Sequence, residues 1–131
     1  MTVSTDRNLI EIVSLLDFAA TLARVTDAIT AAGLTVFARI DHAHGAAQVG
    51  LAMPPTVVLL YGNPKGGTPI MLAAPGAALD LPLRVLIRAA EAGTLVSFHP
   101  IAPTLLAAGV PDHLANTLDP AQHLVVEAIQ P

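Results

Sequence analysis

The chain has 131 residues, of which 53% are hydrophobic and 12% are charged, and its formal net charge is −4 at pH 7. This composition excludes a disordered chain, because disorder requires a sequence too polar to bury a core. It also argues against nucleic-acid binding, since six Lys and Arg residues are scattered along the chain and aromatic residues make up only 3%.

The absence of cysteine excludes disulfides, thiolate metal sites and cysteine nucleophiles. The N-terminus lacks the basic and apolar regions of a leader sequence, and no apolar run approaches the roughly 20 residues of a membrane span. We therefore expect a single cytoplasmic domain over residues 1–131, without membrane contact. The scarcity of charge predicts a surface buried between two copies, as in a homodimer.

The first expected elements are a strand and a helix. A short β-branched segment predicts the strand over residues 8–16. Asp17 has the character of a helix N-cap, and the apolar residues after it recur at helical spacing until Gly33, which favours a helix end. We therefore predict a helix over residues 18–32.

The next segment alternates between apolar and polar residues, which predicts a half-buried strand over 34–42. The residues expected to share its apolar face are Leu34, Val36, Ala38 and Ile40, with His42 continuing the same phase. Residues 43–55 are small and glycine-containing, end in two prolines, and can hold one short helical turn.

A continuous apolar run predicts a central strand over 56–62. Thr68 followed by Pro69 is typical of the N-cap and first position of a helix. Pro75 and Gly76 then favour the end of that short helix.

The remaining elements are a hairpin and terminal helices. Alternation predicts strands over 83–90 and 94–99, joined by a turn. Asp119 and Gln122 have the spacing of a capping box, which predicts a last helix to about residue 129. Together the elements predict an α+β fold in two layers, with a mainly antiparallel sheet and helices on one face.

Four motifs occur in order over about residues 40–87. They are Asp41-His42 with Gly45, Gly62-Asn63-Pro64-Lys65, Gly67-Thr68-Pro69 with Met71, and Asp80-Leu81-Pro82-Leu83. In these motifs the chain resembles the widespread bacterial domain of unknown function number 302. The resemblance implies a β-α-β-β-β-β-α order of the TATA-box-binding-protein-like class, and dimers. It assigns no biochemical function, and the class label implies no DNA binding.

The glycine-rich stretch after the central strand is the first candidate site. It is not a Walker motif, because Lys65 precedes the last glycines instead of following them. A helix starting at Thr68 would still offer unpaired N–H groups and a positive dipole end to an anion. The predicted ligand-binding residues are Asn63, Lys65, Gly66, Gly67 and Thr68. The alternative is a plain strand-to-helix link in which the glycines supply backbone freedom.

Histidines supply the second candidate site. Asp41 and His42 are candidates for an acid–base pair at a strand end. His42, His44 and His99 are candidates for a metal- or haem-linked sensor, provided that His99 arrives from another strand end. The alternative is a buried His42 that is hydrogen-bonded to backbone.

The sequence therefore favours a homodimeric binding module for a small anionic ligand or a protein partner. Two alternatives stay open: a small enzyme that uses Asp41 and His42, and a metal- or haem-linked sensor that uses His42, His44 or His99. The sequence identifies no cofactor.

Overall fold

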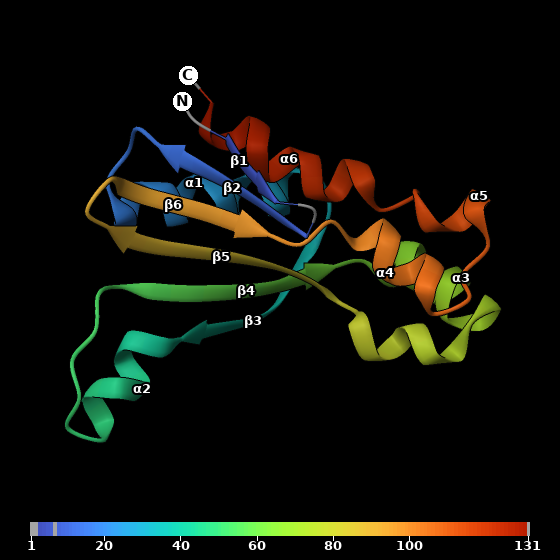
Figure 1. Cartoon of the computed structure of the whole chain (residues 1–131), viewed down its shortest axis with the longest axis horizontal. Helices are drawn as coiled ribbons and strands as arrows, with labels where there is room; N and C mark the ends of the chain where they lie inside the picture. Colours follow the sequence, from blue (N-terminus) through green and yellow to red (C-terminus); the bar gives the residue numbers. More distant parts are fainter. Residues whose placement is uncertain (1–2, 7, 131) are drawn as a thin grey trace.

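A computed structural model describes residues 3–6 and 8–130, with side chains from residue 8 onward. Its centre is a six-stranded antiparallel sheet of order β1-β2-β6-β5-β4-β3 (Figure 1). The strands are β1 (Val3–Asp6), β2 (Leu9–Ser14), β3 (Thr35–Asp41), β4 (Thr56–Gly62), β5 (Leu83–Ala90) and β6 (Gly93–Phe98). The predicted α+β class and antiparallel sheet are confirmed.

The helices fall into three groups. Their bounds are α1 (Phe18–Ala31), α2 (His42–Gln48), α3 (Pro64–Ala73), the 3-10 helix η1 (Pro75–Asp80), α4 (Ile101–Ala107), α5 (Asp112–Ala115) and α6 (Asp119–Ile129). The long helices α1 and α6 pack together behind one face of the sheet (Figure 1). Helices α3, η1, α4 and α5 gather at one end of the sheet, whereas α2 projects beyond edge strand β3.

Helix α1 forms where the sequence predicts it. The side chain of Asp17 accepts a hydrogen bond from the Ala20 N–H at 2.8 Å, as an N-cap does. The helix then crosses the covered face to join β2 to β3, which run parallel to each other at distant positions of the sheet. Val25 and Ile29 of α1 are fully buried against the sheet and α6.

The core lies between this helical layer and the inner face of the sheet. Its largest fully buried side chains are Ile12, Val25, Ile29, Val57, Leu59, Tyr61, Ile70, Val85, Ile87, Val96, Leu105 and Val125. The central strands β4 and β5 each bury every second residue, in the alternation expected of strands covered on one side.

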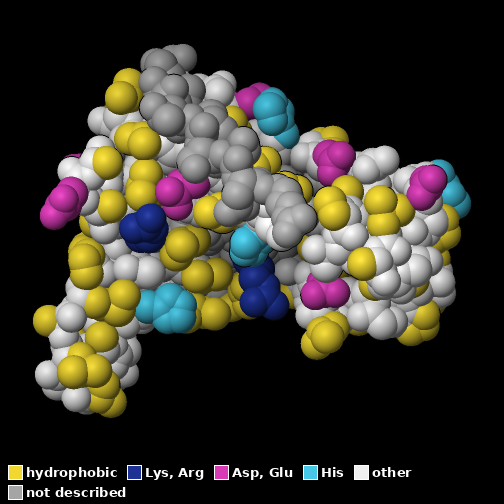
Figure 2. Space-filling model, viewed as in Figure 1, with side chains coloured by type: hydrophobic (Ala, Val, Ile, Leu, Met, Phe, Trp, Pro, Cys, Tyr) yellow, Lys and Arg dark blue, Asp and Glu magenta, His cyan; other side chains and the backbone are white. Residues whose placement is uncertain are grey.

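The opposite face of the sheet is not covered by helices and carries a small polar cluster among apolar side chains (Figure 2). Glu11 accepts hydrogen bonds from the Ser97 hydroxyl at 2.9 Å and from Arg88 at 3.4 Å. The pairing of β2, β6 and β5 sets these three residues on one face.

Four local features of the fold differ from what the sequence indicates. Strand β1 extends the sheet by a hairpin that the polar N-terminal sequence did not indicate. A register shift between Val36 and Ala38 interrupts the alternation of β3, so Ala38 and Ile40 do not share the face of Val36. Gln122 does not cap α6; it is buried, accepts from the Ile101 N–H and donates to the His99 carbonyl. The fourth concerns the start of α3, described below.

Candidate functional site

Helix α3 begins at Pro64, five residues before Pro69, the predicted first position of the helix. Asn63 is the N-cap, and its side-chain oxygen accepts a hydrogen bond from the Lys65 N–H at 2.9 Å. Pro64 occupies the first helical position, where its missing N–H costs nothing. Thr68 is therefore inside the helix, and its predicted role as the cap is wrong.

This earlier start changes the expected anion cradle. The N–H groups of Gly66 and Gly67 both donate to the Asn63 carbonyl at 3.0 Å. With Lys65 capped and Pro64 lacking an N–H, the first turn has satisfied its own donors. The Lys65 side chain is exposed to solvent.

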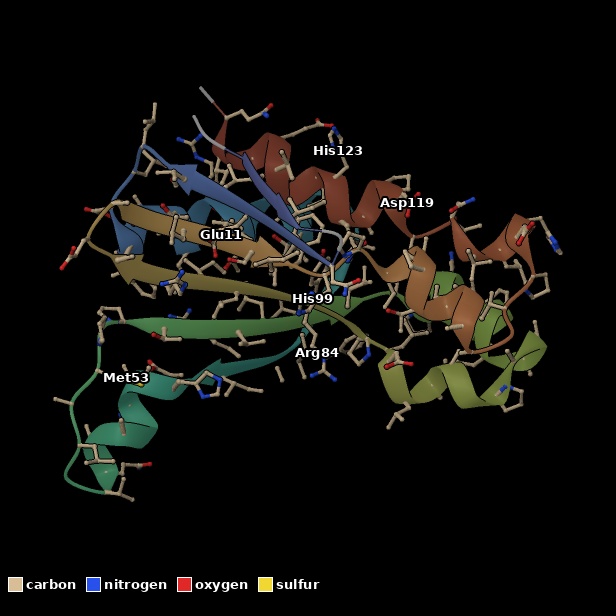
Figure 3. The ribbon with its side chains drawn as sticks, in the orientation of Figure 1. Glu11, Met53, Arg84, His99, Asp119 and His123 are labelled. Carbon is tan, nitrogen blue, oxygen red and sulfur yellow. The ribbon has the colours of Figure 1, made fainter. Side chains whose placement is uncertain are left out.

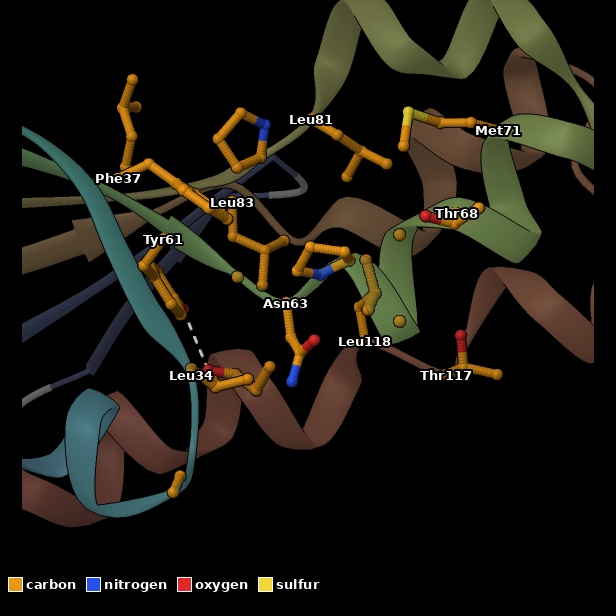
Figure 4. Close-up of a pocket in the computed structure, with 18 of the residues that line it drawn as sticks. Leu34, Phe37, Tyr61, Asn63, Thr68, Met71, Leu81, Leu83, Thr117 and Leu118 are labelled. Atoms are coloured by element: carbon orange, nitrogen blue, oxygen red, sulfur yellow. Dashed lines mark hydrogen bonds between the residues drawn. The ribbon is translucent and has the colours of Figure 1, made fainter.

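A cavity of about 740 Å³ lies beside this helix start (Figure 4). Its lining residues are Ala32, Leu34, Phe37, Leu60, Tyr61, Gly62, Asn63, Pro64, Gly66, Gly67, Thr68, Met71, Leu81, Pro82, Leu83, Thr117, Leu118, Pro120 and Ala121. They come from β3 and the residues before it, the end of β4, α3, the segment that leads into β5, and the segment that leads into α6 with its first turn. Four of the five predicted ligand-binding residues line this cavity, and Lys65 does not.

The glycines of α3 allow this close approach. A Cβ on Gly66 would lie 3.2 Å from Cδ2 of Leu118, which is too tight unless Leu118 shifts. A Cβ on Gly67 would meet Met71 Cε at 3.7 Å and Leu81 Cδ1 at 3.9 Å, both ordinary contacts inside the cavity. Gly66 therefore lets α3 pack against the residues before α6, and Gly67 leaves open space.

Polar groups in the cavity are few. Asn63, Thr68 and Thr117 bring side-chain amide or hydroxyl groups, and the Thr117 hydroxyl donates to the Leu114 carbonyl at 2.7 Å. The Tyr61 hydroxyl donates to the Ala121 carbonyl at 2.9 Å, which ties β4 to α6 across the back of the cavity. Burial raises the pKa of Tyr61 well above its ordinary value of 10, so its phenol stays neutral.

The Asp41 and His42 pair is arranged differently from the prediction. Asp41 is the N-cap of α2, and its carboxylate accepts from the His44 N–H at 2.9 Å. His42 begins α2 and is exposed, so the predictions that it follows the apolar face of a strand or is buried are wrong. A smaller hollow of about 360 Å³ is lined by Asp41, His44 and Met53 among others, but not by His42.

The three histidines of the sensor hypothesis are not brought together. His99 follows β6 and its Nδ1 contacts the Asn8 carbonyl, whereas His42 and His44 belong to α2 beyond β3. Strands β5 and β4 separate these two places, and Figure 3 shows His99 far from Met53, which follows α2. Among residues 8–130, whose side chains the structure describes, no three His, Asp or Glu side chains are grouped to hold a metal ion.

The sequence motifs indicate the α3 side of the cavity, but they do not indicate its other walls. Leu34, Leu81 and Leu118 are separated widely along the chain and become neighbours only through the sheet order and helix packing. The motif Asp80-Leu81-Pro82-Leu83 was the one further signal, since three of its residues line the cavity.

The fold and the site together define the class of this protein: an antiparallel α+β domain with an apolar cavity at one end of its sheet. The chain belongs to the family described as domain of unknown function DUF302, whose profile matches residues 10–130. This confirms the resemblance seen in the sequence motifs. A solved structure of an uncharacterized conserved DUF302 protein from Bacillus stearothermophilus has a TM-score of 0.81 and 12% identity, covering 95% of this chain and 97% of that chain. At this identity the likeness shows the fold alone.

Similar curated proteins are named as fluoride channels. Fluoride-specific ion channel FluC 1 of Brucella suis is 40% identical over 81 residues, which are 62% of this chain and 32% of that protein. Fluoride-specific ion channel FluC 2 of Brucella melitensis is also 40% identical over 81 residues, 30% of its length. This chain therefore spans about a third of the length of these relatives. In the described part of the chain, no helix has the length and hydropathy needed to cross a membrane.

Proposed function

We propose that this protein is a homodimeric binding module whose cavity takes a small, mainly apolar molecule carrying one polar or anionic group. The cavity of about 740 Å³ beside α3 is the observation that supports this proposal. Sites for small molecules typically have volumes of about 300–1,000 Å³ and apolar walls with a few polar groups. The cavity has both properties.

The walls favour an apolar body for the ligand. Among the residues that the structure describes, none that lines the cavity is Asp, Glu, Lys, Arg or His. A charge placed deep in the cavity would therefore lose its hydration without gaining a partner. An aliphatic or aromatic group would instead replace water against Leu34, Leu81 and Leu118.

The polar end of the ligand is assigned to the start of α3. The Asn63 oxygen is engaged with the Lys65 N–H, which leaves the amide nitrogen to donate to a ligand. Thr68 offers a hydroxyl from the next turn. Lys65 is exposed beside Asn63 and would meet an anionic group that reaches the cavity mouth. The sequence predicted a small anionic ligand, and we now propose more specifically a ligand with one charged end and an apolar body.

Two fluorescent probes test this assignment. 8-Anilinonaphthalene-1-sulfonate and N-phenyl-1-naphthylamine share an apolar body, and only the first carries a negative charge. We expect both to bind at one site per chain, with the sulfonate several-fold tighter. Fluorescence titration of the folded protein measures both affinities. If neither probe shows saturable binding, the proposed function is contradicted.

Gly67 provides the matched variants. Gly67→Leu should fill the cavity and weaken both probes about tenfold or more, a loss of at least roughly 1.4 kcal/mol. Gly67→Ala is the control, because its Cβ makes only ordinary contacts. It should retain most of the affinity. Thermal unfolding establishes that both variants are folded.

Lys65→Ala separates the charged end from the apolar body. It should weaken the sulfonate several-fold and leave N-phenyl-1-naphthylamine unchanged. If each probe binds Lys65→Ala with the same affinity as it binds the wild type, Lys65 has no part in the site. The assignment of the apolar cavity as the binding site would not be affected.

The curated relatives favour a second candidate, an accessory domain of a membrane transport protein. Their 40% identity to this chain lies in 81 residues, a minority of proteins named as fluoride-specific channels. In this reading the domain binds a channel or its regulator. Copurification of the tagged chain with a fluoride channel in detergent, compared with the Gly67→Leu variant, tests for such a complex and for the role of the cavity in it.

A further inference from the structure

The segment of residues 42–55, called the arm below, projects from the body without burying any side chain. It consists of α2 and the connection to β4, and it extends beyond β3 (Figure 1). Its large apolar side chains Val49, Leu51 and Met53 are 73%, 66% and 42% exposed. A helix as short as α2 is marginal in water without tertiary packing. The arm therefore presents an apolar surface that calls for a covering partner.

Charge restricts the nature of that partner. The arm contains no Asp, Glu, Lys or Arg. It offers no cations for anionic lipids and no ion pairs for a charged protein surface. The surface that fits it is apolar and uncharged.

The chain itself presents such a surface at the other end of β3. Leu72 of α3 and Leu79 of η1 are 78% and 83% exposed. Between the arm and the end of the molecule that carries α3 and η1, the outline of the molecule is indented along β3 (Figure 2). Phe37 of β3, Met71 of α3 and Leu81, which follows η1, all line the cavity.

Strand β3 forms the base of the indentation. It is the last strand of the sheet and pairs only with β4 among the described strands. Its outer backbone groups are therefore available for pairing with another strand. A two-fold axis through the middle of β3 would join two such edges antiparallel and place each arm in the indentation of the other copy, a self-complementary contact.

We propose that two copies pair through β3 and that the arm of each copy closes the ligand cavity of the other. This deepens the proposed function, on which the closure of the cavity rests. Centred on Ala38, the pairing sets a small side chain on the axis. It also brings Arg39 opposite the exposed ring of Phe37 at the cavity mouth, an arrangement that favours a cation over an aromatic face. The occupant of the indentation is thus a second copy of this chain.

Single cysteines test the pairing, because the chain contains none of its own. In Ala38→Cys the two copies of the residue would face each other at roughly 5 Å between Cα atoms, within the reach of a disulfide. In Thr35→Cys, the control on the same strand, they would be roughly 20 Å apart. We expect a covalent dimer on mild oxidation of Ala38→Cys and none from Thr35→Cys. Equal cross-linking of both variants, or of neither, would overturn the β3 pairing.

A charge on the arm tests the closure. Leu51→Asp should convert the dimer to a monomer and weaken N-phenyl-1-naphthylamine binding about tenfold. Leu15→Asp is the matched control, since Leu15 is 72% exposed and follows β2, which β6, β5 and β4 separate from β3 in the sheet. Light scattering after gel filtration measures the mass, and fluorescence titration measures affinity.

The outcomes separate this inference from the proposed function. A wild-type monomer, or a Leu51→Asp dimer, would overturn the inference while probe binding to the cavity could still stand. A monomeric Leu51→Asp with unchanged affinity would overturn the closure of the cavity. If the wild type binds no probe, the proposed function fails, and the cross-linking result still decides whether β3 pairs.

Discussion

Helices α2 and α3 resemble each other in their local sequence features, but they differ in how much of each is buried against the rest of the domain. Each follows a strand directly, each has a polar N-cap with a side-chain hydrogen bond, and each contains glycine. Yet α3 buries Ile70 completely in the core, whereas α2 has no buried residue. Capping therefore fixes where both helices start, and burial determines which of them belongs to the folded body.

The difference also assigns different tasks to the two regions. The start of α3 lies close to Leu118 and forms part of the cavity wall. The arm depends on local hydrogen bonds such as that of Asp41 to the His44 N–H, and opens at a low cost in free energy unless a partner covers it.

The largest effect should follow from removing the burial of α3. Ile70 is 0% exposed, so Ile70→Ala should lower the free energy of unfolding by about 2–5 kcal/mol through lost burial and a residual cavity. Leu51→Ala on the exposed arm should change it by less than about 0.5 kcal/mol at concentrations where the protein is monomeric.

Urea unfolding followed by circular dichroism measures both values. A loss of several kcal/mol for Leu51→Ala in the monomer would mean that the arm packs on its own body, contrary to the structure.

Alkaline pH should weaken the cavity side of the molecule through Tyr61, the single tyrosine of the chain. Its folded pKa lies above the ordinary value of 10, so the unfolded chain ionises first. The corresponding stability is fully present below pH 10 and falls by up to about 1.4 kcal/mol per pH unit as the pH rises above 10.

Tyr61→Phe is the matched variant for this measurement. It should lose about 1–2 kcal/mol at neutral pH, because the Ala121 carbonyl loses its donor. It should also remove part of the alkaline decline in unfolding free energy. An identical decline in both proteins above pH 10 would show that other groups cause it.

Removing the N-cap side chains of α2 and α3 should have the smallest effects on stability, and the effects should differ between the two helices. Asn63→Ala should cost about 1 kcal/mol of global stability, since it deletes the bond to the Lys65 N–H. Asn63→Asp keeps an acceptor at the cap and serves as the control. Asp41→Ala should leave global stability nearly unchanged and accelerate amide exchange only within residues 42–48.

Hydrogen exchange measured by mass spectrometry distinguishes these responses. Uniform acceleration across the sheet in Asp41→Ala would show that α2 unfolds together with the body.

The elements with strong internal patterns were predictable. Strands β4 and β5 form where continuous or alternating apolar residues occur, and α1 forms from its Asp17 cap and helical periodicity. These signals are local and are reinforced by burial. The start of α3 was misplaced because Asn63-Pro64 and Thr68-Pro69 both carry cap signals. The helix begins at the earlier one, where Gly66 of the first turn lies close to Leu118.

The candidate site was only half predictable for the same reason. The glycines and Asn63 are visible as a local motif, and the structure places them at the cavity. The apolar walls and the exclusion of Lys65 from the lining depend on where distant segments meet. The Asp41 and His42 pair looked like a strand-end site because nothing in the sequence indicates that Asp41 is used as a helix cap.

The sequence by itself determined the fold class, the position of most strands and membership of the DUF302 family, because periodicity, caps and motifs are properties of neighbouring residues. Only the tertiary structure decided the sheet order, the bulge in β3, the exposure of the arm and the cavity between α3 and α6. These features arise from contacts between residues far apart in the chain, and their free energies depend on the packing of the whole domain.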